Sequence, residues 1–261
     1  MKNILKILTF NLKNDSPFTM STYRWENRYK YIKLILNTLD YDLLGVQELN
    51  SKYLEQMNKL LPAYFSIGLP RTSSKSEDEL AAIFFSKERF HCIKENTFWL
   101  SEFPYKQGSK LKSSIFPRIC TLCLLEDHAT HSQLLFVNTH LDHLLPYTRQ
   151  LQIQQLIHVI QTFKEGFDPY ILITGDFNTS IHSHALTTLL NSELNVSSIF
   201  DDKATNTLHF FNGKQYQNKE PIDHIFYDQR LKLLDYKIIS EHFDGHYPSD
   251  HFPVYARILI K

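Results

Sequence analysis

Apolar residues recur along the chain in two spacings, one typical of strands and one of helices. Ile4–Phe10 is a short apolar run of the kind that forms a buried strand. The segment Tyr23–Leu39 has apolar residues three or four positions apart, which predicts an amphipathic helix with one buried stripe. Tyr41–Glu48 is again an apolar run and predicts a second buried strand. The chain therefore begins with a strand, a helix and a strand.

The same order of strand, helix and strand is predicted again from about residue 133. Further helices are expected at Tyr53–Leu61, Leu151–Phe163 and Ala185–Leu190. Further strands are expected at Tyr64–Leu69, Leu80–Ser86, Thr97–Ser101, Ile119–Leu125, Gln133–His140, Tyr170–Thr174, Ile222–Tyr227, Lys232–Ile239 and His251–Leu259. Buried strands with one-sided helices predict an α/β (α+β) fold, a four-layer α-β-β-α sandwich of two mixed sheets. No linker or repeat interrupts the sequence, so we expect one domain over residues 1–261.

Composition and charge narrow the class of partner. Hydrophobic residues make up 43% of the 261 positions, enough for a large core. Lys plus Arg and Asp plus Glu number 28 each, so the formal net charge is zero. Proteins that grip long nucleic acid without sequence preference usually carry a basic excess, because neutralised phosphates release counterions. The balance here disfavours a general duplex nuclease.

Cysteine use and the start of the chain bear on compartment. Cys120 and Cys123 lie in a predicted strand, where positions three apart face opposite sides, so they suit neither a zinc site nor a redox pair. The first residues are too short and too interrupted by lysine to form a secretory leader, and no apolar run reaches the ~20 residues of a membrane span. We expect a cytoplasmic monomer, with export by a non-classical signal as the open alternative.

Polar residues at the ends of the apolar strands are the candidate chemistry. They are Asn11, Glu48, His140, Asp176, Asn178, Asp223, Asp250 and His251. Each alone has an ordinary structural explanation as a turn, a cap or a satisfied core histidine. Acids and histidines at so many buried strand ends, however, require partners or a cation to offset their desolvation.

The segments that contain these residues resemble motifs of the endonuclease/exonuclease/phosphatase superfamily, in the order found there, and the bacterial branch in particular. The motifs are Thr9-Phe10-Asn11, Gly45-Val46-Gln47-Glu48, Phe98 to Pro104, Pro117-Arg118, Asn138 to Asp142, Thr174 to Asn178, Ile222 to Ile225 and Ser249 to Val254. The resemblance covers essentially the whole chain. It implies a DNase I-like fold and a metal-dependent phosphoric ester hydrolase.

The resemblance also implies roles for individual residues. Glu48 resembles the principal Mg²⁺ ligand of the family, with Asn11 beside it and Asp250 near the same metal; Mn²⁺ is an alternative ion. Asp176 and Asn178 resemble the pair that orients the attacking water, and Asn178 also holds a phosphate oxygen. Arg118 and His140 resemble groups that bind the non-bridging oxygens. Asp223 resembles the carboxylate that orients His251. The base can be either His251 or Asp176.

The chain departs from some relatives of this superfamily. Lys13 stands where nucleases of the abasic-site type carry an acid, which favours one metal ion over two. Asp142 stands where the polyadenylate-shortening relatives usually have a lysine, and the residues around Asn178 and Asp223 differ from those of inositol polyphosphate phosphatases. Both differences weigh against polyadenylate and inositol polyphosphates as substrates.

Three functions remain open at the level of sequence. The first is a Mg²⁺-dependent phosphodiesterase that acts on nucleic acid or a nucleotide-like ester by metal-assisted attack of water. The second has the same chemistry with a phospholipid headgroup or a phosphorylated small molecule as substrate. The third, a phosphate-binding module without turnover, is disfavoured because each motif is intact. The loops Arg71–Glu79 and Ser101–Pro117 are expected to select the ester.

Overall fold

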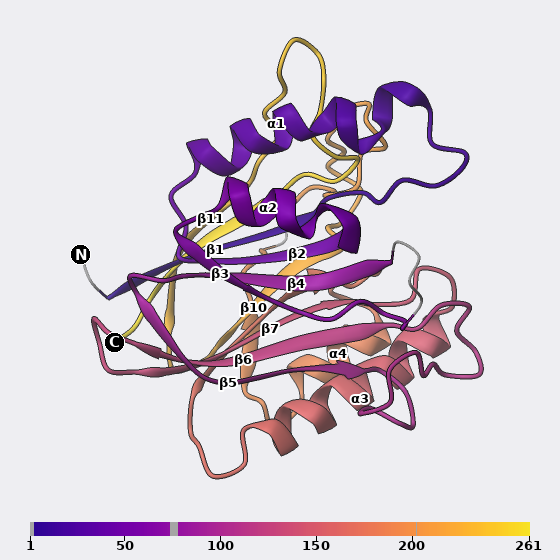
Figure 1. Cartoon of the computed structure of the whole chain (residues 1–261). Coiled ribbons are helices and arrows are strands. Elements are labelled where there is room, and N and C mark those ends of the chain that lie inside the picture. Colours follow the sequence, from indigo (N-terminus) through magenta and orange to yellow (C-terminus); the bar gives the residue numbers. More distant parts are fainter. Residues whose placement is uncertain (1–2, 74–77, 202) are drawn as a thin grey trace.

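The computed structural model describes residues 3–73, 78–201 and 203–261, in which two six-stranded sheets pack face to face between two layers of helices (Figure 1). The first sheet has the order β11-β12-β1-β2-β4-β3. Its strands are β1 (Ile4–Asn11), β2 (Leu43–Asn50), β3 (Tyr64–Ile67), β4 (Glu79–Ser86), β11 (Lys232–Ile238) and β12 (Val254–Leu259). The predicted four-layer sandwich is therefore confirmed.

The second sheet has the order β5-β6-β7-β8-β10-β9. Its strands are β5 (Phe90–Trp99), β6 (Ile119–Asp127), β7 (Gln133–His140), β8 (Tyr170–Asp176), β9 (Val196–Ser198) and β10 (Asp223–Asp228). Each sheet holds one parallel pair, β1 with β2 and β7 with β8, and the other pairings are antiparallel. Both sheets are therefore mixed, and each parallel pair is joined by a crossover helix.

The helices cover the outer faces of the two sheets. The helices α1 (Trp25–Thr38) and α2 (Leu54–Leu60) lie over the first sheet, and α3 (Pro146–Phe163) and α4 (His184–Leu190) lie over the second (Figure 1). Short 3₁₀ turns at Ser21–Tyr23 and Ser51–Tyr53 precede α1 and α2. No helix in the described ranges is both long and apolar enough to cross a membrane.

Three apolar layers follow from strand alternation. In β1, Leu5 and Ile7 enter the core between the sheets, whereas Leu8 and Phe10 pack beneath α1 and α2. In the second sheet, Phe136 of β7 faces the other sheet, and its neighbours Leu135 and Val137 pack toward α3. The alternation also separates the two cysteines, since Cys120 lies in the outer layer and Cys123 between the sheets, as predicted.

Several element bounds differ from the predicted ones. The strand expected at Thr97–Ser101 runs from Phe90 to Trp99 at the edge of the second sheet, where its first seven residues have no regular apolar alternation. The helix expected at Leu151 begins at Pro146, where proline suits the first turn. The last strand begins at Val254 rather than His251, and the three-residue β9 was not predicted. Four residues of the predicted loop Arg71–Glu79 lie outside the described ranges.

Candidate active site at the strand ends

Strand alternation brings side chains from both sheets to one end of the sandwich. Asn11 lies four residues after the inward-facing Ile7, and His140 four residues after the inward-facing Phe136, so each shares the inner face of its strand. Asp223 likewise follows the parity of inward-facing Ile225. The polar ends of β1, β7 and β10 therefore meet between the sheets, where apolar side chains would otherwise continue the core.

Beneath these residues lies a buried polar layer that crosses between the sheets. The Gln47 amide nitrogen donates to Asn138 Oδ1 at 2.6 Å and to Thr9 Oγ1 at 3.0 Å. Asn138 in turn donates to the carbonyl oxygens of Val46 at 2.8 Å and Ala82 at 2.9 Å. Gln47 Oε1 is buried without a partner among the described residues, but the four bonds made by the two amide nitrogens join the sheets directly below the candidate site.

Glu48 reaches the site through an irregularity in β2. The register between β2 and β4 shifts between Val46 and Leu49, and Glu48 itself has a left-handed φ of 55°. A bulge of this kind re-aims a side chain that regular alternation would turn toward the helices. The Glu48 carboxylate accepts hydrogen bonds from the Asn14 backbone at 2.8 Å and from Asn11 at 3.1 Å. Burial alone would raise the pKa of Glu48, but Lys13 and these bonds lower it.

Asp176 occupies the centre of the group. Asn11 donates to Asp176 Oδ2 at 2.9 Å, and the Asn178 backbone donates to Oδ1, also at 2.9 Å. The Nε2 atoms of His140 and His251 lie 3.6 Å and 3.9 Å from Asp176 Oδ2. Burial, followed by the charge of Asp223, raises the pKa of Asp176 to about 7.

His251 lies between two carboxylates. Its Nδ1 is 2.8 Å from Asp223 Oδ2, and its Nε2 faces Asp176. Burial disfavours the imidazolium, yet the two carboxylates outweigh that effect and raise the pKa of His251 well above its usual value. The other Asp223 oxygen, Oδ1, is buried and has no hydrogen-bond partner among the described residues.

Arg118 and His140 line a small cavity beside this group, together with Arg71 and Glu79. Arg118 is buried and donates from Nη2 to His143 Nδ1 at 3.0 Å, while its Nε has no partner in the described part of the chain. Burial and the nearby Arg118 charge lower the pKa of His140 well below its usual value. His140 is therefore neutral, and the cavity presents a guanidinium donor with one bond still to make.

Asn178, two residues after the end of β8, adopts a left-handed φ of 52°. Its side-chain nitrogen donates to the Leu141 carbonyl at 3.1 Å, which ties the turn after β8 to the residue that follows His140. A left-handed asparagine is compatible with a tight turn. The predicted pair Asp176 and Asn178 is thus held by a backbone hydrogen bond between its own members.

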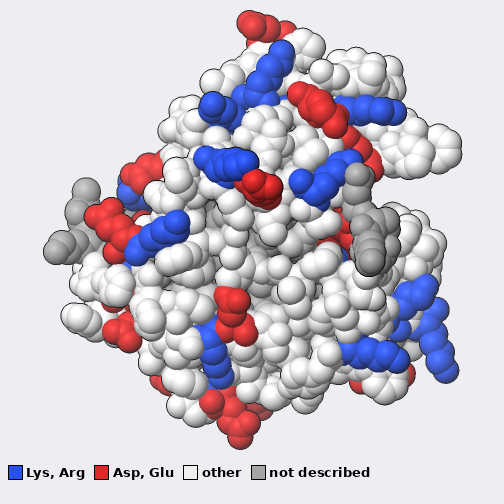
Figure 2. Space-filling model, viewed as in Figure 1, with Lys and Arg blue, Asp and Glu red and all other residues white. Residues whose placement is uncertain are grey.

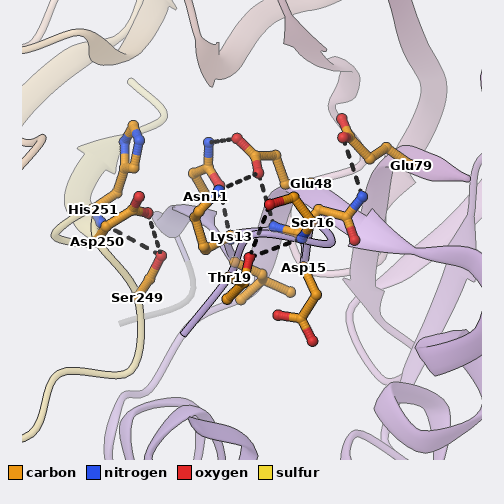
Figure 3. A network of polar contacts seen from close by, with 12 residues as sticks. Asn11, Lys13, Asp15, Ser16, Thr19, Glu48, Glu79, Ser249, Asp250 and His251 are labelled. Carbon is orange, nitrogen blue, oxygen red and sulfur yellow. Dashed lines mark hydrogen bonds and ion pairs between the residues drawn. The ribbon is translucent and has the colours of Figure 1, made fainter. Parts of the chain in front are cut away.

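Asp250 lies at the opposite side of Asn11 from Glu79 (Figure 3). It is buried and follows Ser249, whose hydroxyl is 3.4 Å from Asp250 Oδ1. Burial raises the pKa of Asp250, and the Glu48 charge adds to this effect. Asp250 is not among the metal-ligand atoms that lie within 4.8 Å of one another in this part of the structure.

Ligand-type atoms of Glu48, His140 and Asp176 lie within 4.8 Å of one another. Glu48, Asp176, Asp223 and Asp250 are also four carboxylates gathered in one buried region, and repulsion between Asp176 and Asp223 is visible in the raised pKa of Asp176. Carboxylate oxygens are the ligands that Mg²⁺ prefers, and a divalent charge would offset this repulsion. The residues present therefore fit a divalent cation.

Two residues that support the site were not among the candidate site residues of the sequence. Arg28 of α1 is buried and donates to the carbonyl oxygens of Leu12 and Pro248, both at 2.7 Å, and of Lys13 at 2.6 Å. It thereby joins the segment after Asn11 to the segment before Asp250. A charged residue three positions after Trp25, on the apolar stripe of the helix, was the available signal.

Asp142 is the second such residue, and its structural use explains a difference noted in the sequence. Its Oδ1 accepts from the backbones of Leu144 and Leu145 at 2.9 Å and 3.0 Å. Its Oδ2 lies 3.1 Å from Ser114 Oγ. The acid therefore orders the turn before α3 and anchors the loop that precedes Arg118.

Residues 8–251 match the model of the Endonuclease/Exonuclease/phosphatase family. This match covers most of the chain, and the protein belongs to that family. Members of the family are hydrolases that act on phosphoester bonds, so the chain is a family phosphoesterase in which acidic and histidine side chains form a candidate metal cluster.

Individual relatives span different activities. The chain is 26% identical over 271 residues to a probable CCR4-Not complex 3'-5'-exoribonuclease subunit Ccr4 of Enterocytozoon bieneusi, with 84% of this chain and 55% of the relative covered. The chain thus spans about half the length of that curated relative. A mannosyl-6-phosphatase from Bacteroides thetaiotaomicron has a TM-score of 0.88 at 26% identity, over 98% of this chain and 99% of that one.

A family member from Bacteroides vulgatus has a TM-score of 0.89 at 27% identity, with both chains fully covered. Together with the mannosyl-6-phosphatase, it confirms the predicted resemblance to bacterial members of the family and the predicted fold.

Proposed function

We propose that this protein is a Mg²⁺-dependent phosphoesterase that cleaves a phosphate ester by attack of water. The observation that carries the proposal is the convergence of Glu48, His140, Asp176 and the Asp223–His251 pair within one buried group between the sheets. A phosphate ester is anionic, so its hydrolysis requires neutralised oxygens and a positioned nucleophile more than covalent chemistry by the protein.

Glu48 would hold the cation, with Asn11 and Asp250 as neighbouring oxygen donors. When bound, Mg²⁺ supplies positive charge against the phosphate oxygens and the leaving group. As oriented, the Asn11 amide nitrogen faces both carboxylates, and its oxygen accepts from the Lys13 backbone at 2.9 Å. Rotation of this amide by half a turn would offer the oxygen instead, since amide orientation is assigned from its partners. Mn²⁺ suits the same donors.

Asp176 is the group we assign to accept a proton from the attacking water. Its carboxylate is oriented by Asn11 and by the Asn178 backbone, one donor on each oxygen. His251 lies between Asp223 and Asp176, so its ring is held as a cation that binds phosphate oxygen rather than as a base. Arg118, His140 and Asn178 complete the phosphate site, in which the buried Arg118 Nε is a donor without a partner among the described residues.

A phosphodiester of nucleotide-like size is the first candidate substrate. Positive and negative side chains are interspersed on the face drawn in Figure 2, and the formal net charge is zero, so neither favours a long polyanion. The second candidate is the phosphomonoester of a small molecule. The likeness to a mannosyl-6-phosphatase over nearly the whole of both chains favours it.

The test compares hydrolysis of bis-p-nitrophenyl phosphate and p-nitrophenyl phosphate in Mg²⁺, Mn²⁺ or EDTA. Wild type should turn over at least one ester with a divalent ion and none in EDTA. Glu48→Gln, Asp176→Asn and His251→Asn should each reduce kcat by about 100-fold or more, because each removes a charge from the reacting centre. Turnover that persists in EDTA, or in all three variants, would contradict the proposal.

A further inference from the structure

His143 stands beside the candidate phosphate site in a fixed tautomer. A guanidinium has donors only, so the 3.0 Å contact with Arg118 Nη2 makes His143 Nδ1 the acceptor. The ring proton of neutral His143 is therefore on Nε2. That atom makes no hydrogen bond to the described residues, and the side chain is exposed at the start of the segment between β7 and α3. His143 thus presents a single oriented N–H donor to the solvent.

Phe116 extends the same surface with an apolar ring. Its ring lies nearly parallel to that of His143, with centroids 6.5 Å apart, and it is 45% exposed. Arg71 packs against Phe116 with its guanidinium carbon 5.3 Å from the ring centroid. We call the exposed surface of Phe116 and His143 the aromatic wall. It adjoins the cavity lined by Arg118, His140 and Arg71.

The aromatic wall is held rigidly. Ser114 is buried and donates to the Phe116 carbonyl at 2.7 Å, and its hydroxyl lies 3.1 Å from the Asp142 carboxylate. Asp142 also accepts from the backbones of Leu144 and Leu145, directly after His143. A surface supported from both of its segments in this way is suited to position a ligand.

The two basic groups that touch the aromatic wall carry no free positive charge. Arg71 is ion-paired with Asp78 at 3.1 Å and with Glu79 at 2.9 Å. Burial and the adjacent Arg118 charge lower the pKa of His143 below its usual value, so the ring is neutral at pH 7. Neither Arg71 nor His143 therefore offers a free positive charge to a second phosphate, and Lys110 Nζ, the cation beside Phe116 in the loop, donates to the Ile115 carbonyl at 2.7 Å. An uncharged group that offers a hydroxyl oxygen to an N–H and a C–H face to a ring fits better.

We infer that the aromatic wall binds a sugar ring esterified to the phosphate, with His143 Nε2 donating to a ring hydroxyl and Phe116 packing on the sugar face. This inference rests on the proposed phosphoesterase activity and on the phosphate occupying the Arg118–His140 cavity. The sugar can belong to a hexose phosphate or to the ribose of a nucleotide, since both offer the same chemistry. His143 and Phe116 are specificity-determining residues in this arrangement.

The test measures kcat and KM in Mg²⁺ for three monoesters: mannose 6-phosphate, adenosine 5'-monophosphate and p-nitrophenyl phosphate. His143→Phe keeps a ring and removes the donor, and Phe116→Leu keeps apolar volume and removes the flat face. His91→Phe is the matched control, because His91 is an exposed histidine near the start of β5 and is not part of the aromatic wall. The sugar ester with the larger kcat/KM in the wild type identifies the source of the sugar.

His143→Phe should raise KM for the sugar ester about 10-fold, the worth of one hydrogen bond. KM for p-nitrophenyl phosphate should rise clearly less, because the loss of the Arg118 partner affects all three esters alike, whereas the loss of the Nε2 donor affects the sugar esters alone. His143→Gln, which retains a side-chain N–H, should recover part of the loss. Phe116→Leu should raise the same KM by about 3-fold to 10-fold, and His91→Phe should change nothing.

Equal losses for all three esters would overturn the inference, because they would make His143 a general support of Arg118. Unchanged KM values in both variants, or a wild-type KM higher for both sugar esters than for p-nitrophenyl phosphate, would also overturn it. A wild type inactive on every ester, bis-p-nitrophenyl phosphate included, would contradict the proposed function instead. Calorimetric binding of the two sugar esters in EDTA then tests the aromatic wall without turnover. His143→Phe should bind both sugar esters more weakly than the wild type does.

Discussion

The two halves of the sandwich build their parts of the site in related ways. Each contains a parallel pair of strands joined by a helix, β1-α1-β2 and β7-α3-β8. Each helix carries a buried arginine that binds the chain just after the first strand. Arg28 of α1 donates to the Leu12 carbonyl at 2.7 Å, and Arg149 of α3 donates to the Asp142 carbonyl at 3.0 Å.

The two arginines differ in how much they hold. Arg149 makes one local contact, seven residues away in sequence. Arg28 also binds Lys13 and reaches Pro248, 220 residues away, and so joins the loop after β1 to the segment before Asp250. The first half therefore depends on a distant clamp and a bulge for its candidate metal ligands. The second half positions His140 and Asp176 by regular strand alternation.

Arg28→Met tests the clamp and should have the largest effect on stability. It leaves buried carbonyl groups without donors and Asp15, 3.6 Å away, without its cation. We expect the free energy of unfolding in urea to fall by about 3–5 kcal/mol. Mn²⁺ binding, followed by calorimetry, should weaken as well, because the segments of Asn11 and Asp250 are no longer joined.

Arg149→Met is the matched control and should cost about 1 kcal/mol, the worth of one hydrogen bond. It should leave Mn²⁺ affinity unchanged. Equal losses of stability in the two variants would mean that the halves are supported alike, and the comparison would fail.

The glycines of the two parallel pairs provide a second test. Gly45 pairs with Thr9 and Gly175 with Thr139, so both lie at the same level below the site. A Cβ at Gly45 would meet Thr174 Oγ1 at 2.3 Å, whereas one at Gly175 would meet the Thr139 backbone oxygen at 2.4 Å. Alanine at either position should destabilise by about 2–3 kcal/mol through overpacking.

The atom nearest to the new Cβ belongs to a side chain at Gly45 and to the backbone at Gly175. Thr174→Ala should therefore recover part of the loss in Gly45→Ala, with a coupling of about 1 kcal/mol in a double-mutant cycle. The same truncation should recover nothing in Gly175→Ala. Recovery in both backgrounds would show that Thr174 relaxes the whole interface rather than one contact.

The sequence predicted the second half of the site better than the first, for a physical reason. His140 and Asp176 end apolar strands and face inward by simple alternation, which a pattern of apolar residues reveals. Glu48 was also a candidate as the end of an apolar strand, but alternation alone would turn it outward, and only the left-handed bulge brings it to the site. Bulges depend on the partner strand and leave little signal in one sequence.

Tertiary contacts account for what was missed around the site. His143 was not among the candidate site residues of the sequence; β7 ends at His140, and the turn that follows brings His143 to Arg118. The register of edge strands such as β9 and the first half of β5 is likewise set by neighbouring strands rather than by local apolar pattern.

The two halves should also differ in how their stability depends on pH, because they differ in histidine content. This is the smallest of the expected effects. The first 90 residues contain no histidine, whereas His224 of β10 is fully buried in the second half. Its Nε2 donates to the Thr179 carbonyl at 2.9 Å, and burial lowers its pKa to about 4. The unfolded chain, in which this pKa is near 6.5, binds the extra proton between these values, so stability present above pH 6.5 is lost as the pH falls toward 4.

His224→Gln keeps a side-chain N–H for Thr179 and removes the titration. Between pH 8 and pH 5.5 the variant should lose about 1.4 kcal/mol less of its unfolding free energy than wild type. Urea unfolding at the two pH values measures this difference, and hydrogen exchange should show wild-type protection falling in β8 and β10 before β1 and β2. Acid sensitivity that is unchanged in the variant, or that begins in β1 and β2, would contradict the assignment of the acid-labile region to the sheet that contains His224.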